Sequence, residues 1–489
     1  MELGHLNLYN SRTRSVEVFE SLRDNEVRIY VCGLTPSARA HLGHARSFLF
    51  FDVLRRYLTH RNYRVTFVQN VTDIDDRSIA AAKATGENYH AIIERNYAEF
   101  KAAMRKLGVL EYDREPFATD FIEPIQQMIR ELVATGHAYA SKDGIYYRVA
   151  SFANYGKLAN RKIEELEAGA RIEVDEHKED PLDFALWKFA KEGEPSWPFD
   201  PYGAGRPGWH IECSAMARAL LDPAGEGIDI HGGGADLIFP HHENEIAQSE
   251  PLMAHPPMAN FWVHGGLLLF DNKKMSKSLG NYEPLSDLLE RHDPQAIRLF
   301  LLQTSYAKVK NFTEDSVAGA TVALRQLKRA YRRLHARGDA ARATDLTKTG
   351  YVRRIEAELD ADMNTAAALA VMLEFAGRAD EVAAVAGAGE TLHEFAYLLT
   401  LLGIDPTPAW LEETLAPLPA NFVERLTAAL HEPFDGATPE GAIDAVIAMR
   451  REARERKDWA ASDRFRDALL ECGVALKDSK EGTSWSAVG

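Results

Sequence analysis

The tetrad His41-Leu42-Gly43-His44 contains residue types suited to phosphate chemistry, and it stands where a helix is predicted to begin. The N-terminus of a helix presents unpaired N–H groups and partial positive charge, and both favour a bound phosphate. His41 and His44 are three residues apart and therefore share one helix face. Gly43 lacks a side chain, so a flat base could lie against the backbone there. Taken alone, such a pair is more often a helix cap or two surface histidines.

A second group, Lys274-Met275-Ser276-Lys277-Ser278, places two lysines and two serines in a short loop. These side chains are mobile hydrogen-bond donors suited to a polyphosphate. An isolated basic loop of this kind carries little information. In this order and separation, however, the tetrad and the loop together resemble the double signature of class I aminoacyl-tRNA synthetases and their close relatives.

The third group consists of Cys32, Cys213, His241 and Glu245. Two thiolates, an imidazole and a carboxylate form a plausible zinc shell. His241 and Glu245 are four residues apart, so on a helix both side chains point the same way. The sequence has no Cys-x-x-Cys pair, and from spacing alone such a set is more often buried small residues beside a salt bridge on a helix face.

The elements that must position these groups begin with a βαβ unit. Val27–Cys32 is an apolar, β-rich run that predicts a buried strand, helical periodicity runs from His41 to Leu58, and Tyr63–Asn70 predicts a second strand. Such a unit is parallel and right-handed. Ligands bind at the carboxyl ends of its strands, where Cys32 and Thr72 stand. Further strands are predicted at Ile228–His231 and Phe261–Gly265, and almost continuous helix from Glu314 onward.

The composition is that of a globular protein of about three domains, with 489 residues, 46% hydrophobic and 27% charged. No apolar run approaches the ~20 residues of a membrane span, and no signal peptide is visible. Three cysteines cannot form a disulfide framework, so we expect a reducing cytosol and a cytoplasmic protein. The net charge of −16 disfavours indiscriminate binding to polyanions.

At this point the sequence resembles the cysteinyl-tRNA synthetases, a class I family, over essentially the whole chain. The segments that carry the resemblance are Tyr30–Gly33, His41–Arg46, Val71–Asp76, Gly205–Met216, Asp229–Glu250, Lys274–Asn281 and the tail from Lys457 to Trp485. The resemblance implies an α/β fold. A Rossmann-like parallel-sheet catalytic domain with an insertion is expected, followed by an all-α helical bundle and a small C-terminal anticodon-binding domain.

The expected boundaries divide the catalytic domain into two halves. These halves are residues 1–118 and 205–266, and a connective insertion at 119–204 separates them. A stem-contact region at 267–313 carries the Lys-Met-Ser-Lys-Ser loop. It is followed by a tRNA-binding helical bundle at 314–403, a linker at 404–419 and the anticodon-binding domain at 420–489.

The implied activity is that of a cysteine–tRNA ligase. The cysteine carboxylate attacks the α-phosphorus of ATP, and magnesium-bound pyrophosphate leaves. A hydroxyl of the terminal adenosine of tRNA(Cys) then attacks the adenylate. The expected partners are therefore tRNA(Cys), L-cysteine and ATP with Mg²⁺, with no membrane, no stable protein partner, and a monomeric state.

The family's functional positions fall on matching residues of this chain. One zinc ion per chain, bound by Cys32, Cys213, His241 and Glu245, would hold the substrate thiol. The catalytic positions are His41, His44, Lys274 and Lys277, and the ATP-binding positions are Gly43, Gly232, Gly233 and Lys277. The cysteine pocket comprises Gly33, Thr72, Trp209, His231 and Asp236. The anticodon positions are Arg454, Trp459, Asp463 and Asp478.

Zinc has a physical reason in such a site. Pocket shape alone separates near-isosteres such as cysteine and serine by only ~10²-fold. A metal with soft ligands prefers a thiolate to a neutral hydroxyl, and it favours the deprotonated thiol. No stretch of the chain is long enough for a separate editing domain, which agrees with rejection of serine at the binding step.

Two alternative functions remain, and a departure in the loop after Gly33 favours the first of them. The family commonly has Thr-Val-Tyr-Asp where this chain has Thr35-Pro36-Ser37-Ala38, and the proline resembles the paralogous cysteine:amino-sugar ligase of mycothiol synthesis. The anticodon-type tail favours the tRNA ligase, and the intact signatures argue against a non-catalytic RNA-binding relative. Asp73, Asp75 and Asp76 resemble a magnesium cluster, but we expect them to cap a helix and make the pocket polar.

Overall fold

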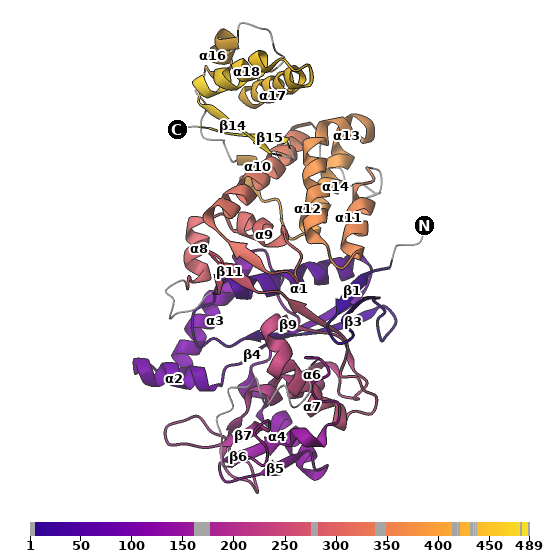
Figure 1. Cartoon of the computed structure of the whole chain (residues 1–489), viewed down its shortest axis with the longest axis vertical. Helices are drawn as coiled ribbons and strands as arrows, with labels where there is room; N and C mark the ends of the chain where they lie inside the picture. Colours follow the sequence, from indigo (N-terminus) through magenta and orange to yellow (C-terminus); the bar gives the residue numbers. More distant parts are fainter. Residues whose placement is uncertain are drawn as a thin grey trace. The chain divides into compact units, whose positions relative to one another are not determined.

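The computed structural model describes residues 5–160, 177–274, 282–337, 349–412, 418, 421–430, 434, 436, 438–479 and 482–487. The chain forms two compact units, residues 1–406 and 407–489, and each is considered by itself (Figure 1). None of the helices in these ranges combines the length and the apolar character that a membrane crossing requires.

A parallel four-stranded sheet forms the centre of the first unit, in the order β10-β9-β3-β4. Its strands are β3 (Glu26–Leu34), β4 (Arg64–Val71), β9 (Ile228–Gly234) and β10 (Ala259–Gly265). Helix α1 (Leu42–His60) connects β3 to β4, as the predicted βαβ unit requires. The α/β fold class expected from the sequence is confirmed.

The two faces of this sheet serve different purposes. Tyr30, His231 and Trp262 are register neighbours on three adjacent strands, and their rings contact one another across the sheet. Neighbouring residues along a strand point to opposite faces. Gly232 therefore faces α1, where a Cβ atom would lie 2.1 Å from the ring of Phe51. The helix packs this closely because position 232 has no side chain.

A mixed segment interrupts the sheet between β4 and β9. It contains α2 (Asp76–Thr85), α3 (Tyr89–Lys106), α4 (Ile122–Ala134) and an antiparallel sheet of β5 (Ala138–Ala140), β6 (Gly144–Tyr147), β7 (Phe184–Phe189) and β8 (Gly205–Pro207). Helix α6 (Trp209–Leu221) leads from this segment back to the central sheet. Its buried side chains join those of α4 and of the Tyr30 face of the sheet in one core.

Beyond β10 the first unit is mainly helical. A small sheet of β11 (Leu268–Phe270), β12 (Lys273–Lys274) and β13 (Lys310–Phe312) comes first, with α8 (Leu285–Arg291) and α9 (Pro294–Leu302) between its last two strands. The bundle in Figure 1 then comprises α10 (Glu314–Arg337), α11 (Tyr351–Asp360), α12 (Thr365–Gly377), α13 (Ala379–Ala386) and α14 (Ala388–Leu401). Helix α10 begins at the residue where the sequence predicts the helical region to start.

The second unit is built from short helices and a hairpin. Its elements are α15 (Pro408–Glu412), α16 (Phe422–Leu430), α17 (Pro439–Glu455), α18 (Trp459–Glu471), β14 (Val474–Ser479) and β15 (Gly482–Ala487). Its core includes Ile443, Phe465 and Trp485. Helix α15 lies inside the stretch expected as a linker, because prolines can open a helix as well as interrupt one.

A buried ion pair joins distant elements of the first unit. Arg298 of α9 is fully buried and donates to Asp52 Oδ2 of α1 at 2.5 Å, to Leu402 O at 2.8 Å and to Leu107 O at 3.0 Å. Burial alone would raise the pKa of Asp52, but Arg298 and Arg56 hold it below its usual value. One guanidinium thus holds the ends of α3 and α14 against α1.

Arg298→Leu is expected to destabilise the first unit by about 3–5 kcal/mol, because it leaves Asp52 buried without its main partner. Urea unfolding followed by circular dichroism measures the loss. Arg95→Gln is the control, since the Arg95–Glu87 pair is exposed and contributes at most about 1 kcal/mol. Equal, small effects of both variants would contradict this role for Arg298.

Candidate active site

Cys32 lies two residues after Tyr30 on β3 and therefore shares the face of the sheet that carries α6. Directly beyond it the strand is irregular, because the register between β3 and β4 shifts between Val31 and Leu34. Gly33 lies in this bulge, where a Cβ atom would stand 1.7 Å from Asn70 O. Its N–H donates to Asn70 Oδ1 at 2.8 Å. Glycine at position 33 is therefore required by the close approach of β4.

The other three members of the predicted metal group come from two further segments, helix α6 and the continuous stretch from residue 238 to residue 249. Cys213 lies on α6, His241 on the π-helical turn η4 (Ile238–His242), and Glu245 on α7 (Glu243–Ser249). One ligand atom from each of the four residues lies within 4.8 Å of all the others, and all four residues are buried. Glu245 Oε1 is 3.3 Å from Cys32 Sγ and 3.1 Å from His241 Nε2. The fold thus brings together residues up to 213 positions apart.

The chemistry of this cluster fits a zinc ion. Two sulfurs, one imidazole nitrogen and one carboxylate oxygen are a typical tetrahedral donor set. Glu245 Oε2 is buried and has no hydrogen-bond partner among the described residues, which is costly for a charged group. Cys32, His231, His242 and Glu245 form a second, overlapping group within the same distance. The set with two thiols suits a soft metal better.

The protonation of the cluster is governed by burial and by close contacts. Burial raises the pKa of the Cys32 thiol well above its usual value. Burial would also raise that of Cys213, but the hydrogen bond with Cys32 and the neighbouring His241 lower the pKa of Cys213 to about 6. The Nδ1 atom of His241 lies 3.0 Å from Nδ1 of His210. Such outer contacts orient a metal-binding imidazole.

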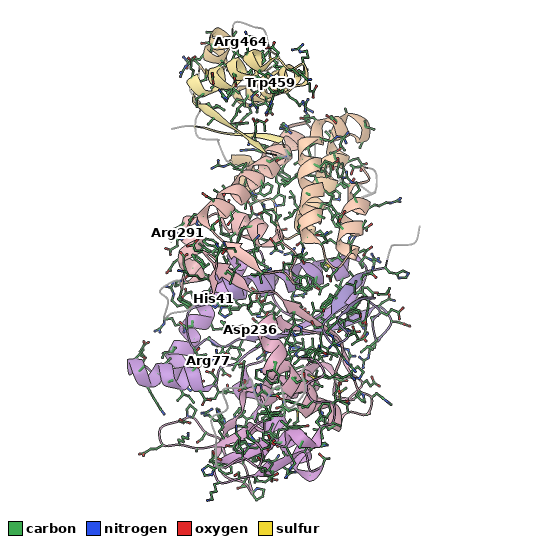
Figure 2. The ribbon with its side chains drawn as sticks, in the orientation of Figure 1. His41, Arg77, Asp236, Arg291, Trp459 and Arg464 are labelled. Carbon is green, nitrogen blue, oxygen red and sulfur yellow. The ribbon has the colours of Figure 1, made fainter. Side chains whose placement is uncertain are left out.

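The residues predicted to bind cysteine do not all lie in one place. The ring centroids of Trp209 and His241 are 4.4 Å apart, and His231 Nε2 is 3.6 Å from Cys32 Sγ. Trp209 and His231 therefore border the cluster. Thr72 is buried beside the bulge and accepts a hydrogen bond from Asn70 Nδ2 at 3.2 Å. Asp236 is exposed and its charge acts on His41, the residue labelled beside it in Figure 2.

His41 and His44 form a capping box at the N-terminus of α1. His41 Nδ1 accepts from Gly43 N, and His44 Nδ1 accepts from His41 N, each at 3.1 Å. Burial lowers the pKa of His41 to about 4, opposed in part by Asp236, and it lowers the pKa of His44 well below its usual value. Both rings are thus neutral near pH 7. Because each Nδ1 is an acceptor, the hydrogen-bond network assigns the proton to Nε2.

The glycine run after His231 has a packing explanation. Position 232 is filled by the ring of Phe51, and a Cβ at Gly233 would lie 2.9 Å from Leu237 and 3.0 Å from His242. Lys274 ends β12, and only its backbone is described. Lys277 and the rest of the predicted loop lie outside the described residues.

The three aspartates after β4 do not form a cation site. Asp75 caps α2 by accepting from Ser78 N at 2.7 Å, which confirms the predicted capping role. Asp73 accepts from the Thr119 hydroxyl at 2.6 Å. Asp76 makes ion pairs with Lys188 and Arg206 at 2.5 Å each. Each carboxylate therefore has its own structural partners.

Sequence reasoning missed several residues around the cluster. His242 Nδ1 lies 2.7 Å from His264 Nε2, and His264 Nδ1 lies 2.8 Å from Ser11 Oγ. Glu212 is fully buried, and burial raises its pKa well above the usual value, with Cys213 adding to the shift. His242 directly follows the predicted ligand His241, and Glu212 directly precedes Cys213, so their adjacency to predicted ligands could have indicated them. No feature of the sequence indicates His264.

In the second unit, two of the predicted anticodon residues bind each other. Asp478 accepts from both Nη atoms of Arg450 at 2.7 Å and from Arg454 Nη1 at 2.9 Å. Arg450 is buried and was not predicted. Trp459, labelled in Figure 2, is 60% exposed at the first turn of α18. Asp463 lies one turn further on, exposed and 3.1 Å from Arg466.

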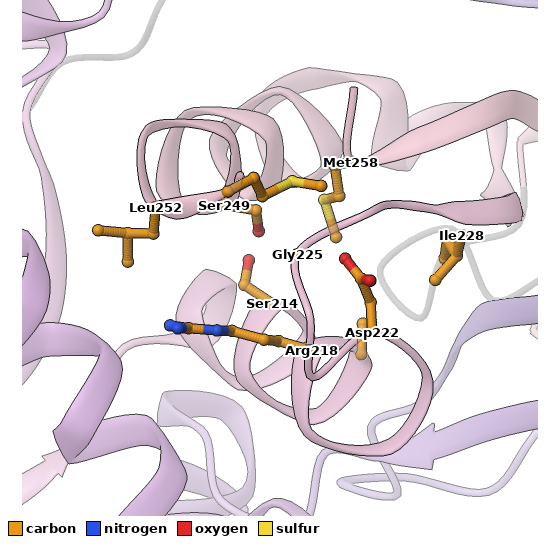
Figure 3. Close-up of a pocket in the computed structure, with 10 residues that line it drawn as sticks. Ser214, Arg218, Asp222, Gly225, Ile228, Ser249, Leu252 and Met258 are labelled. Carbon is orange, nitrogen blue, oxygen red and sulfur yellow. The ribbon is translucent and has the colours of Figure 1, made fainter. Parts of the chain in front are cut away.

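A small pocket lies elsewhere along α6 (Figure 3). Its lining includes Ser214, Arg218, Asp222, Ser249, Leu252 and Met258. None of the predicted site residues that the structure describes borders it. The candidate active site is therefore the cluster at the carboxyl ends of β3 and β9, not this pocket.

Comparison with known proteins agrees with this geometry. Residues 18–322 match the family model of the class I (C) tRNA synthetase catalytic domain, and residues 439–485 match that of the cysteinyl-tRNA ligase anticodon binding domain. A cysteine–tRNA ligase of Alkalilimnicola ehrlichii is 44% identical over 98% of this chain and 99% of its own. One of Ectopseudomonas mendocina is 45% identical with the same coverage.

Solved structures show the same fold at low identity. The methionyl-tRNA synthetase of Mycobacterium tuberculosis has a TM-score of 0.54 and 16% identity, covering 77% of this chain and 89% of its own. The LeuRS–tRNA complex of Agrobacterium radiobacter has a TM-score of 0.58 and 12% identity, covering 80% and 88%. With the full-length identity to curated relatives and both family models, the chain belongs to the cysteine–tRNA ligase family of class I aminoacyl-tRNA synthetases.

Proposed function

We propose that this chain activates L-cysteine with ATP, giving cysteinyl-adenylate and pyrophosphate, and then transfers cysteine to the 3′ end of tRNA(Cys). The main support is the buried convergence of Cys32, Cys213, His241 and Glu245, with the ring of Trp209 against that of His241. We assign activation to residues 1–118 and 205–266 and anticodon recognition to residues 420–489. The enzyme would act in the cytoplasm as a monomer.

Cysteine recognition is proposed to depend on a zinc ion held by those four residues. When bound, zinc supplies a soft Lewis acid that prefers the deprotonated thiol of cysteine to the hydroxyl of serine. Trp209 and His231 border the cluster, and their rings exclude water from one side of the bound amino acid. Gly33 and Thr72 border it at the bulge, and Asp236 would act on the side of His41.

Adenylate formation depends on positioning of the substrates and on stabilisation of charge by the protein more than on covalent chemistry by its side chains. His41 and His44, neutral at physiological pH, are proposed to donate from Nε2 to phosphate oxygens of ATP bound with Mg²⁺. Lys274 and Lys277 would add positive charge. The nucleotide would lie along Gly43, Gly232 and Gly233, at the helix N-terminus.

The second unit is proposed to read the anticodon. The bases of RNA loops are unstacked and can stack on aromatic side chains. Trp459 is exposed at the start of α18, with the Asp463 carboxylate one turn away. Arg454 and Asp478 would contribute as a connected pair, with Arg450 fixing the carboxylate.

Charging of unfractionated tRNA with labelled cysteine tests the function, with serine as the control amino acid. Cysteine should be incorporated and serine should not. Cysteine-dependent exchange of pyrophosphate into ATP without charging would indicate the amino-sugar ligase instead. The absence of both reactions in zinc-loaded protein would indicate a non-catalytic relative.

Cys213→Ser should weaken the binding of zinc and of cysteine together, each by more than about 100-fold, because even outer contacts of a metal ligand change affinity by 10–100-fold. Metal analysis and equilibrium dialysis with labelled cysteine measure the two affinities. Cys472→Ser, a buried thiol of the second unit, is the matched control. Unchanged cysteine affinity in Cys213→Ser would contradict the proposed role of the metal.

Trp459→Ala and Asp463→Ala should lower kcat/KM for tRNA in charging while pyrophosphate exchange stays at the wild-type rate. A lost stacking contact of about 1–3 kcal/mol corresponds to about 5- to 150-fold for Trp459→Ala. Glu424→Ala, which removes an exposed carboxylate from α16, controls for the general loss of charge. A parallel loss of pyrophosphate exchange would exclude an anticodon role for the residue concerned.

A further inference from the structure

The loop between β3 and α1 leads from Cys32 to the His41–His44 tetrad, and Arg39 stands in it two residues before His41. We propose that Arg39 is a positioning residue for adenylate formation, fixing His41 by fastening the loop to α3 on one side and to α8 on the other. The inference rests on the proposed function, because His41 matters only if the site binds ATP.

Arg39 uses all three nitrogens of its guanidinium. Nε donates to both carboxylate oxygens of Glu99 on α3, at 2.8 and 3.0 Å. Nη1 and Nη2 donate to the two oxygens of Asp287 on α8, at 2.9 and 2.5 Å, and Nη2 also donates to Ser286 Oγ at 2.6 Å. Two-pronged contacts to carboxylates fix both direction and distance. A lysine, as a point charge, cannot reproduce them.

The backbone beside Arg39 is held at the same place. Leu285 N donates to Ala40 O at 2.8 Å, and His41 forms an antiparallel bridge with Pro284. The Tyr282 hydroxyl donates to Arg39 O, and its ring meets that of His41 edge-on at 5.8 Å between centroids. The loop is thus bound on its α8 side over consecutive residues that lead directly into the tetrad.

The α3 side is fixed by a second residue. Asn96 Nδ2, which is buried, donates to Pro36 O at 2.9 Å. Glu99 is three residues further along α3, on the same helix face. Helices α3 and α8 lie side by side near the start of α1 in Figure 1. Arg39 is therefore the residue through which both helices hold one end of the loop.

The geometry separates this role from cysteine binding. Among the residues that the structure describes, the hydrogen bonds of the Arg39 side chain are all with α3 or α8, and none is with the metal cluster. Arg39 lies two residues before His41, within about 7 Å along the chain, whereas Cys32 is seven residues away on β3. Loss of its contacts should therefore displace His41 more than the cysteine pocket. A shift of about 1 Å at a reacting site costs up to ~10²-fold in rate.

The experiment compares Arg39→Lys and Arg39→Met with wild type in the full-length protein. Cysteine-dependent ATP–pyrophosphate exchange gives kcat and the KM for ATP, and equilibrium dialysis gives the Kd for cysteine. Arg39→Met should lower kcat/KM for ATP by about 10- to 100-fold and leave the Kd for cysteine and the zinc content unchanged. Arg39→Lys should restore only part of the rate, because it keeps the charge and loses the two-pronged contacts.

Two further variants keep the test decisive. Arg105 lies on α3, as Glu99 does, and makes an exposed contact of 2.7 Å with Glu111. Arg105→Gln removes this contact and should leave the exchange rate, the KM for ATP and the Kd for cysteine at wild-type values. Asp287→Asn weakens the α8 contact without disturbing the loop sequence, and it should reproduce the Arg39→Met pattern more mildly even if Arg39→Met is insoluble.

Three results would overturn the inference. They are an unchanged exchange rate in both Arg39→Met and Asp287→Asn, full recovery in Arg39→Lys, and a parallel loss of cysteine affinity, zinc and rate. Failure of the proposed function is distinguishable, because the wild-type protein would then show no cysteine-dependent exchange.

Discussion

The rest of this structure depends on one constraint, the burial of two thiols, an imidazole and a carboxylate beside one another. Four such groups cannot be buried within 4.8 Å of one another unless something compensates their polarity. Strand β3, helix α6 and the π-helical turn that leads into α7 each bring donor atoms to that point, and glycine at position 33 lets β4 approach closely beside it. The surrounding rings of Tyr30, His231 and Trp262 then exclude water.

The proposed phosphate site is built on different principles. His41 and His44 satisfy each other's backbone at the start of α1 and remain neutral, so they are suited to donating hydrogen bonds rather than to carrying charge. Fixed donors of this kind need no reorganisation during reaction. The loop that leads into them is bound to α3 and α8, whereas the cluster is held by β3, α6 and the turn before α7.

Much of the framework was predictable because it is encoded locally. The apolar run at Val27–Cys32, the helical periodicity after His41 and the run before Thr72 correctly placed β3, α1 and β4 to within one or two residues. The capping role of Asp75 and the beginning of α10 at Glu314 were likewise predicted. Helix α15, within the stretch predicted as a linker, was not predicted.

The order of residues along the chain specifies which residue types are available and which short elements carry them, because helix and strand periodicity depend on near neighbours. How these elements meet depends on the folded arrangement of the whole unit. Cys32 and Glu245 are 213 positions apart, Phe51 explains Gly232, and Arg450 binds the Asp478 carboxylate expected to read a base. Such contacts depend on strand register and on side-chain packing between distant segments, which no local pattern records.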